Sequence, residues 1–338
     1  MFKEFLMISV IVSTFDQPDA LAALLAGLSC QTTSEPFEVI VCDDGSKSDA
    51  AEVVRHWGAK GRLDVKLVWQ PDIGCRVSRS RNNGIRMARG GLLVFLDGDL
   101  LVRPDLLASH IEQHTTGQHR VVCGSRRSGE FRSPDRLSEI LRSEETPQVV
   151  LHRLWGECHV LDQPTDTQVR KGWLKTSSKW MAMVSCNFSV PKTSDIWFDE
   201  CFVGWGYEDT ELAFRLICIH GYEVVYAPMT ESLHLFIGGA IPSANPLFIN
   251  ARQNVSPVIR NLMYFLSLYP NHDLRPALFF FNRCELDRAT DQWYTLTEPR
   301  GVLVEEALAA ARVWQGRQSQ REQTTEVLQM ASREEMIE

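Results

Sequence analysis

The nine cysteines of the sequence include no C-x-x-C pair, and their number is odd. Several lie inside apolar runs, such as EVIVCDDG (38–45) and RLICIHG (215–221). This pattern argues against a disulfide framework or a zinc site, and it favours reduced, buried thiols in a cytoplasmic protein.

Long apolar stretches and a surplus of basic residues are also missing. No stretch approaches the ~20 apolar residues of a membrane span, so we expect no transmembrane segment. The N-terminal MFKEFLMISVIVSTF carries Glu4 and no small-residue cleavage site, which argues against a signal peptide. The net charge of −8 argues against nucleic acid as a partner.

Strand-like and helix-like segments alternate four times in the first 125 residues. The runs at 7–13, 37–45, 64–70 and 92–99 are apolar and rich in β-branched residues, and a helix-like segment follows each of them. This alternation predicts an α/β fold with a parallel, doubly wound sheet. Ligands of such sheets bind outside the carboxyl ends of the strands. The segments that follow the four strands, STFDQP, DDGS, QPDIG and DGD, are therefore candidate site residues.

The DGD segment places Asp97 and Asp99 at the end of the buried run LLVFL. A tight turn is the simpler interpretation, because Asp and Gly both favour turns. The alternative is a divalent cation, since carboxylates are natural ligands of Mg²⁺ and Mn²⁺. Five arginines within CRVSRSRNNGIRMAR (75–89) would help such a cation to neutralise a diphosphate.

The segment VGWGYEDTELAFRL (203–216) combines a glycine loop, an aromatic residue and two acids. Glu208 and Asp209 begin a predicted helix, where acids are favourable as simple capping residues. Trp205, between two glycines, also suits the apolar face of a sugar, and a helix N-terminus would keep Asp209 ionised as a general base requires. His234, in SLHLFIGG, is a core residue unless other metal ligands accompany it.

These segments together resemble a known family. SVIVSTFDQP, EVIVCDDGS, SRSRNNGIRMARGGLLVFLDGD and FDECFVGWGYEDTELAFRL…SLHL, in this order and spacing, are similar to family 2 glycosyltransferases. The second half resembles the galactosyltransferase-type region of bacterial chondroitin polymerases and β-1,4-galactosyltransferases. The resemblance covers roughly residues 7–125 and 180–240. It implies a GT-A fold, a Rossmann-like and mostly parallel sheet, with a C-terminal helical extension.

The resemblance also implies a domain organisation. Residues 1–125 would bind the nucleotide-sugar, and residues 126–240 would form the acceptor-binding and catalytic half. A helical extension (241–300) and an amphipathic helix with a polar tail (301–338) would follow. The segment 126–180 has no counterpart that we can place, and we expect it to lie over the acceptor side.

The roles of individual residues follow from the same resemblance. Asp44, or less favourably Asp43, would hydrogen-bond a uracil, and Asp97 would face the ribose or a metal-bound water. The nucleotide-sugar would contact Thr14, Phe15, Asp16, Asp43, Asp44, Arg76, Arg81, Asn82, Asp97 and Gly98.

The metal, catalytic and sugar-binding residues are implied in the same way. Asp99 and His234 would ligate Mn²⁺ or Mg²⁺, and Asp209 would be the catalytic base of an inverting displacement. Glu208 would grip the acceptor hydroxyls. Asn187, Trp205 and Gly206 would lie beside the donor and acceptor sugars.

The predicted function is the transfer of a hexose or N-acetylhexosamine from a UDP-sugar to a carbohydrate, lipid-linked or peptide acceptor. Two alternatives remain: a sugar nucleotidyltransferase, which would need a glycine-rich basic first loop, and an inactive carbohydrate-binding or scaffold relative. The C-terminal helices are a candidate surface for a homodimer, and the tail after Trp314 for docking to a membrane surface.

Overall fold

Four parallel strands form one half of the main sheet in the computed structural model. They are β1 (Ile8–Thr14), β2 (Phe37–Asp43), β3 (Val65–Trp69) and β4 (Leu92–Asp97), and their order in the sheet is β3-β2-β1-β4. All four lie where the alternating pattern predicts them. Their carboxyl ends therefore meet at one edge, as predicted for the site.

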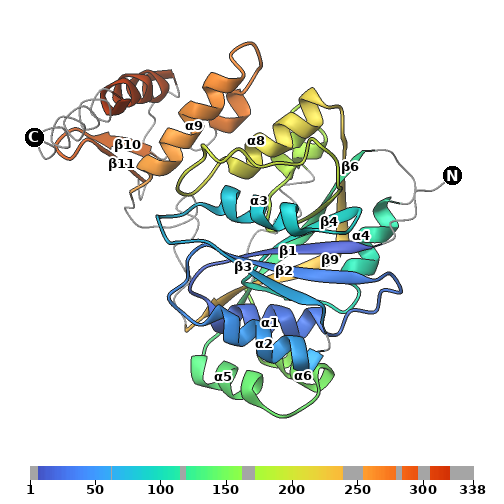
Figure 1. Ribbon diagram of the computed structural model, residues 1–338. Coiled ribbons are helices and arrows are strands. Elements are labelled where there is room, and N and C mark those ends of the chain that lie inside the picture. The colour runs from blue at the N-terminus through green and yellow to red at the C-terminus, as the bar shows by residue number, and fades with distance from the viewer. Residues whose placement is uncertain are drawn as a thin grey trace, which may run out of the picture. The chain divides into compact units, whose positions relative to one another are not determined.

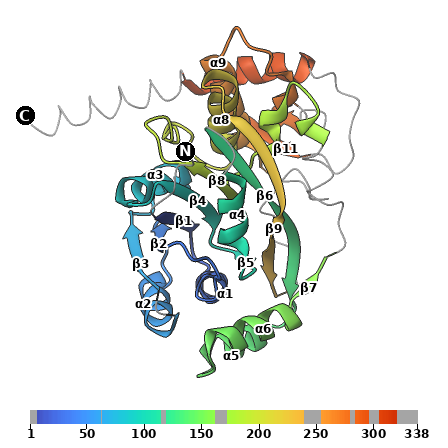
Figure 2. The ribbon, with the colours of Figure 1, turned by 90° about the vertical axis from the view of Figure 1, so that its right-hand side faces the viewer.

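The other half of the sheet continues from β4 in mixed directions. Its strands are β8 (Asn187–Pro191), β6 (Arg120–Phe131), β9 (Glu223–Ile237) and β5 (Leu100–Val102), and β7 (His159–Val160) pairs with β6. The β4–β8 and β8–β6 pairs are antiparallel, whereas β6 and β9 run parallel. Figure 2 shows β3 at one side of this sheet and β6 and β9 at the other. The mixed, mostly parallel α/β sheet confirms the predicted fold class.

The structure describes residues 7–61, 63–114, 119–161, 172–238, 254–278, 284–295 and 305–319. The chain divides into two compact units. The first comprises Met1–Gly204 and Glu208–Pro242, and the second comprises Trp205–Tyr207 and Ser243–Glu338. The predicted boundary at 125/126 falls inside β6. Of the predicted tail after Trp314, residues 315–319 continue a helix, and residues 320–338 lie outside the described residues.

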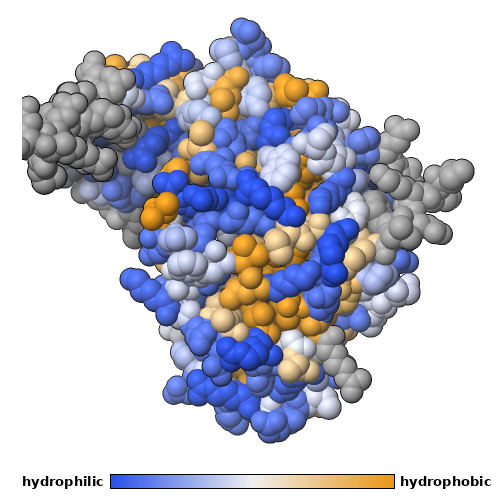
Figure 3. Space-filling view, viewed as in Figure 1, coloured by the Kyte–Doolittle hydropathy of each residue, from blue (hydrophilic) through white to orange (hydrophobic). Residues whose placement is uncertain are grey.

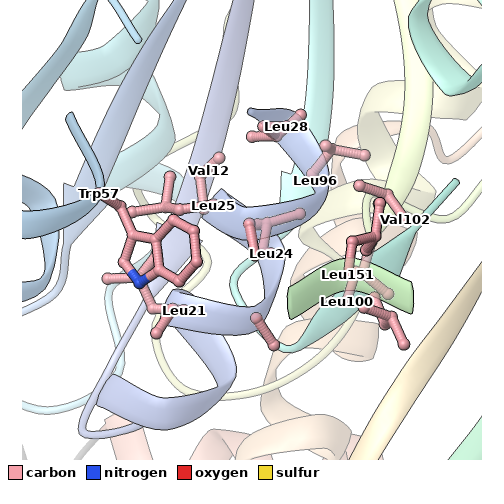
Figure 4. Close-up of a cluster of buried hydrophobic side chains, with 14 of the residues drawn as sticks. Val12, Leu21, Leu24, Leu25, Leu28, Trp57, Leu96, Leu100, Val102 and Leu151 are labelled. Carbon is pink, nitrogen blue, oxygen red and sulfur yellow. The ribbon is translucent and has the colours of Figure 1, made fainter. Parts of the chain in front are cut away.

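The main core of the first unit lies between the sheet and α1 (Pro18–Leu28), which is buried along most of its length. Alternate strand residues supply the sheet side, because successive side chains point to opposite faces. Val10 and Val12 of β1 and Leu96 of β4 pack here with Leu24 and Trp57, the latter from α2 (Ala50–Gly61; Figure 4). The opposite face carries α3 (Val77–Met87) and α8 (Glu208–Phe214; Figure 1). A Cβ at Gly84 of α3 would lie 2.7 Å from Ile11, so glycine permits the close approach of α3 to β1.

The segment 126–180 does not lie as predicted. Helices α5 (Pro134–Arg142) and α6 (Pro147–Glu157) pack on the α1 face, where Leu137, Ile140 and Leu154 join the main core (Figure 1). Ser138 also donates a hydrogen bond to Asp19 of α1. The prediction that this whole segment covers the acceptor side is therefore wrong for α5 and α6. Residues 162–171 lie outside the described residues.

The second unit departs from the predicted all-helical extension. It contains α9 (Ser256–Leu268), the short η3 (Arg275–Leu278) and a helix over 305–319. Residues 284–295, however, form the hairpin of β10 (Cys284–Asp287) and β11 (Gln292–Thr295). Trp314 of the last helix donates its indole N–H to the carbonyl of Asp291, which ties that helix to the hairpin turn.

Six cysteines are buried, as predicted, but Cys75, Cys201 and Cys218 are exposed. Cys218 lies in a π-helical segment, η2 (Arg215–Ile219), that continues α8. Among the described residues, no helix combines the length and apolar character of a membrane span. The face in Figure 3 is mostly hydrophilic, and its apolar side chains gather over the sheet edge at β3, where Trp69 is exposed.

A buried polar network joins α4 (Leu106–His114) to β8. The ring nitrogens of His110 lie 2.8 Å from Ser189 Oγ and 2.9 Å from Asn187 Oδ1, and His114 Nε2 lies 2.8 Å from the same serine oxygen. Burial lowers the pKa of His110 to about 4 and that of His114 to about 3. Both histidines are therefore neutral in the folded protein near pH 7.

We expect these histidines to make the folded protein sensitive to mild acid. Below about pH 6.5 the histidines of the unfolded chain bind protons, whereas the buried histidines of the folded chain stay neutral. The free energy of unfolding is therefore highest above about pH 6.5 and falls toward pH 4, by about 2 kcal/mol for each histidine at pH 5. His114→Gln should lose about 2 kcal/mol less than the wild type between pH 7.5 and pH 5 in urea unfolding. His152→Gln, at an exposed position of α6, controls for the substitution. An identical loss in His114→Gln and wild type would contradict this assignment.

Candidate functional site

The ends of β1 and β4 approach each other closely. Gly98 N–H donates to the Ser13 carbonyl at 2.7 Å, and a Cβ at residue 98 would lie 2.9 Å from that oxygen. Ser13 Oγ also donates to Asp97 Oδ1 at 3.1 Å. Glycine in the DGD segment thus lets the first strand fix the orientation of Asp97.

Arg81 of α3 joins Asp97 to the start of α8. Its Nη2 lies 3.0 Å from Asp97 Oδ1, and its Nη1 lies 3.1 Å from Glu208 Oε1. The Arg81 side chain is only 5% exposed, and its guanidinium lies over the Phe198 ring. A buried cation thus holds together two carboxylates from distant parts of the sequence.

Glu208 and Asp209 have different surroundings although they are neighbours. Burial, with the nearby charge of Asp209, raises the pKa of Glu208 to about 7, although Arg81 acts in the opposite direction. Glu208 Oε2 is buried and has no hydrogen-bond partner among the described residues. Asp209 Oδ2 accepts a hydrogen bond from Ser185 N–H at 3.2 Å, and its Oδ1 lies 3.3 Å from Thr210 Oγ1. The Asp209 carboxylate is therefore held in orientation by its neighbours.

Asp99 and His234 form the candidate metal site. His234 Nε2 lies 3.1 Å from Asp99 Oδ2, because β5 pairs with β9 in the register Leu100–His234. Asp99 Oδ1 is buried without a partner in the described part of the chain. An orphaned carboxylate oxygen beside an imidazole nitrogen fits a Mn²⁺ or Mg²⁺ ion. No cluster of three or more such ligands occurs within the described ranges, so further ligands would come from water or a diphosphate.

Asp44 lies at the end of β2 beside Arg76. Arg76 N–H donates to Asp44 Oδ2 at 2.7 Å, and Gln70 Nε2 donates to Asp44 Oδ1 at 2.5 Å. Arg76 Nε is a buried donor that has no acceptor among the residues described here. The pair therefore offers carboxylate lone pairs and a free guanidinium N–H at one strand end.

Asp16 and Asp43 each use one carboxylate oxygen to bind the loop that precedes α2. Asp16 Oδ1 accepts the backbone N–H groups of Lys47 and Ser48, while Asp43 Oδ1 accepts both the N–H and the hydroxyl of Ser46. These bonds stabilise the loop that precedes α2. Of the two alternatives at the end of β2, the geometry favours Asp44 for a base contact.

The other predicted nucleotide residues differ in accessibility. Phe15 is 46% exposed next to Thr14, which is buried and whose carbonyl accepts from Asp44 N–H. Asn82 is buried and donates to the Phe198 carbonyl and to Glu200, so its side chain supports the segment 198–200. Phe15 is free to contact a ligand, whereas the Asn82 side chain is committed to the fold.

Asn187 is fully buried, and its side chain is committed to the sheet. Its Nδ2 donates to the carbonyls of Ser125 and Thr230, and its Oδ1 lies beside His110. The predicted contact of this side chain with a sugar therefore has no support in the geometry.

Trp205 and Gly206 belong to the second unit. Trp205 is 40% exposed, and the Gly206 carbonyl accepts a hydrogen bond from Asn261 of α9. Gly204, Gly206 and Tyr207 all have positive φ, which places Trp205 within a sharply turned segment. The predicted contact of Trp205 and Gly206 with a sugar stays a prediction.

The strand pattern placed Ser13 and Gln70 in candidate segments but gave them no role; they contact Asp97 and Asp44 respectively. Sequence reasoning missed Ser185, which contacts Asp209. Ser185 acts through its backbone N–H, which no residue type signals.

Comparison with known proteins bears on the family and the fold of the chain. The model of glycosyl transferase family 2 matches residues 9–162. Validoxylamine A glucosyltransferase of Streptomyces hygroscopicus subsp. jinggangensis (strain 5008) is 32% identical over 318 residues, which cover 89% of this chain and 72% of that protein. Hyaluronan synthase of Pasteurella multocida is 31% identical over 220 residues, which cover 62% of this chain and 22% of the synthase.

Solved structures share the fold at low identity. The structure of GalNAc-T7 with UDP, GalNAc and Mn²⁺ has a TM-score of 0.53 at 14% identity, and the match covers 83% of this chain and 51% of that one. At this identity the likeness concerns the fold alone.

Arg81 provides a test of the site's electrostatics. Arg81→Met would leave Asp97 and Glu208 without a counter-charge, and we expect a loss of about 3 kcal/mol in unfolding free energy at pH 8. The loss should be smaller at pH 6, because Glu208, whose pKa rises further without the arginine, is then protonated and uncharged. Urea unfolding at both pH values measures this difference.

Arg103→Met is the matched control. Arg103 is exposed and pairs with Asp105 at 3.4 Å, so its loss should cost below about 1 kcal/mol. Equal, small costs for both variants would show that the buried bridge contributes little to stability.

Proposed function

The chain belongs to glycosyltransferase family 2, and we propose that it transfers a hexose or N-acetylhexosamine from a UDP-sugar to an acceptor hydroxyl or another nucleophile, with inversion. One observation carries the proposal. Three predicted site residues hold a buried polar atom without a partner among the described residues: Arg76 Nε, Asp99 Oδ1 and Glu208 Oε2. Buried polar groups are normally satisfied, so these three atoms support a site for a polar ligand at this position.

The donor would bind along the ends of the parallel strands. Asp44 would accept the N–H of the base, Arg76 would donate to the nucleotide, and Asp97 would face the ribose. Asp99 and His234 would hold Mn²⁺ or Mg²⁺, which when bound neutralises charge on the diphosphate. GalNAc-T7, which shares the fold, holds UDP and Mn²⁺.

The acceptor would be deprotonated by Asp209. The Ser185 N–H holds one oxygen of this carboxylate, which leaves it ready to take a proton from an acceptor hydroxyl as the oxygen attacks the anomeric carbon. Glu208 Oε2 would contact the same acceptor. A single base and direct displacement invert the anomeric configuration, and the alignment of the partners contributes as much as the proton transfer.

Asp209→Asn tests the base. We expect kcat to fall by about 10²–10⁴-fold, because the amide cannot accept the proton. The Kd for UDP, measured by calorimetry with Mn²⁺, should stay within about twofold of wild type, because Asp209 does not belong to the nucleotide-binding strand ends. Asp105→Asn, a control at a half-buried position outside the proposed site, should retain full activity. Loss of UDP binding in Asp209→Asn would assign Asp209 a structural role.

His234→Ala tests the metal site. Wild-type UDP binding should be stronger in Mn²⁺ than in EDTA. His234→Ala should lose most of this difference while its affinity in EDTA stays unchanged, because only the cation is lost. An unchanged Mn²⁺ dependence would exclude His234 as a ligand.

The reaction itself is tested by UDP release from a panel of UDP-sugars with Mn²⁺, with and without EDTA. We expect one sugar to be turned over, and EDTA to stop the reaction. Binding without turnover would favour the inactive relative, and release of diphosphate from UTP and a sugar phosphate would favour the nucleotidyltransferase. If no UDP-sugar is turned over or raises the melting temperature, the proposal fails.

A further inference from the structure

A chain of side-chain hydrogen bonds leads from the surface to Asp44. Arg86 Nη1 lies 2.8 Å from Asn83 Oδ1, Asn83 Nδ2 lies 3.0 Å from Gln70 Oε1, and Gln70 Nε2 lies 2.5 Å from Asp44 Oδ1. Gln70 and Asp44 are buried, whereas Arg86 is exposed. The predicted catalytic and metal-binding residues take no part in this chain.

The direction of every bond in this chain is fixed by its first member. A guanidinium only donates, so Asn83 must present its oxygen to Arg86 and its NH₂ to Gln70. Gln70 must then accept with Oε1 and donate with Nε2. The carbonyl of Arg76, 3.4 Å from Gln70 Nε2, favours the same orientation because a carbonyl only accepts. Asp44 therefore receives a donor and is itself held as an acceptor.

Asp44 needs this support to stay ionised. Burial raises its pKa, and the charges of Asp72 and Asp43 act in the same direction, while the Arg76 N–H and the Gln70 amide oppose them. A protonated Asp44 would present a hydroxyl donor in place of a lone pair. The amide of Gln70 is thus one of two groups that preserve the accepting form.

We propose that Gln70 is a specificity-determining positioning residue: it holds Asp44 as a hydrogen-bond acceptor and thereby selects uracil over cytosine in the donor nucleotide. The inference rests on the proposed function, in which Asp44 meets the base. Uracil carries an N–H at ring position 3, whereas cytosine carries a lone pair there. A carboxylate oxygen fixed as an acceptor bonds the first and repels the second, and a buried polar site rejects a ligand that leaves it unpaired.

Gln70→Glu reverses the polarity at this position with little change in shape. The new carboxyl would lie beside Asp44 Oδ1, and two carboxyls this close share a proton, which turns the pair into a part-time donor. Asn83→Asp should have the same effect, although Asn83 contacts Gln70 and not Asp44. Its carboxylate would bind Arg86 with one oxygen and turn the Gln70 NH₂ toward the other, so that Gln70 Oε1 would face Asp44.

The measurement is the Kd of UDP and of CDP by calorimetry in Mn²⁺. The two ligands share the ribose, diphosphate and cation, so the ratio of their Kd values reports the base alone. We expect wild type to favour UDP by at least about tenfold. In Gln70→Glu and in Asn83→Asp, we expect this ratio to fall at least about tenfold while CDP affinity is kept or improved.

Gln31→Glu is the matched control, because Gln31 Nε2 likewise donates two hydrogen bonds, to the carbonyls of Gly27 and Arg103, away from the carboxyl ends of β1 to β4. It should leave the ratio unchanged. A general loosening of the fold would weaken both nucleotides equally and would also overturn the inference. An unchanged ratio of the UDP and CDP Kd values in Gln70→Glu and Asn83→Asp would also overturn the inference. If wild type binds neither nucleotide, the proposed function fails as well, and the two failures are thereby distinguished.

Discussion

The site depends on one buried guanidinium. Arg81 lies between Asp97 and Glu208, which are far apart in the sequence and are joined by its two ion pairs. Burying Arg81 and Glu208 is costly, and the cost is offset only while the ion pairs are intact, because removal of one partner leaves the others uncompensated. The end of the DGD strand and the start of α8 are therefore held as a single unit. The residues of the first unit that we assign to the donor or the acceptor lie next to this bridge or at the neighbouring strand ends.

The carboxylates of the site are held in place by hydrogen bonds but keep lone pairs that a ligand could use. Ser13, Ser185 and Gln70 satisfy one oxygen each of Asp97, Asp209 and Asp44, which fixes the carboxylates without exhausting their lone pairs. Orphaned atoms remain at the positions where a base, a cation and an acceptor would meet the protein. Such an arrangement gives a charged ligand preformed partners, so little reorganisation is needed when it binds.

The sequence predicted the elements that depend on local pattern. Alternation located the four parallel strands, and strand-end logic brought Asp44, Asp97 and Asp99 to one edge. The sequence did not predict which of the candidate site residues would form hydrogen bonds within the fold instead of facing a ligand. Asp16 and Asp43 bind loop N–H groups. Strand alternation directs the Asn187 side chain toward α4, where it lies beside His110. An amphipathic pattern shows that α5 and α6 bury one side but not against which partner. Regular helical spacing would place Ile219 on the same face as the buried Leu212 and Leu216, yet Ile219 is exposed, because the π-helical segment η2 rotates the following side chains.

The strand order has a consequence for biosynthesis. The open flank of β4 is covered by β8, and the acids at the start of α8 come later still in the chain. A nascent chain therefore carries an unpaired sheet edge for on the order of ten seconds, while the ribosome makes the residues between these strands. During this interval α1 and its apolar partners can already pack, but β8 and α8, which later lie beside the DGD aspartates, have not yet been made. The chemistry of the enzyme becomes available only when the last strands close the sheet.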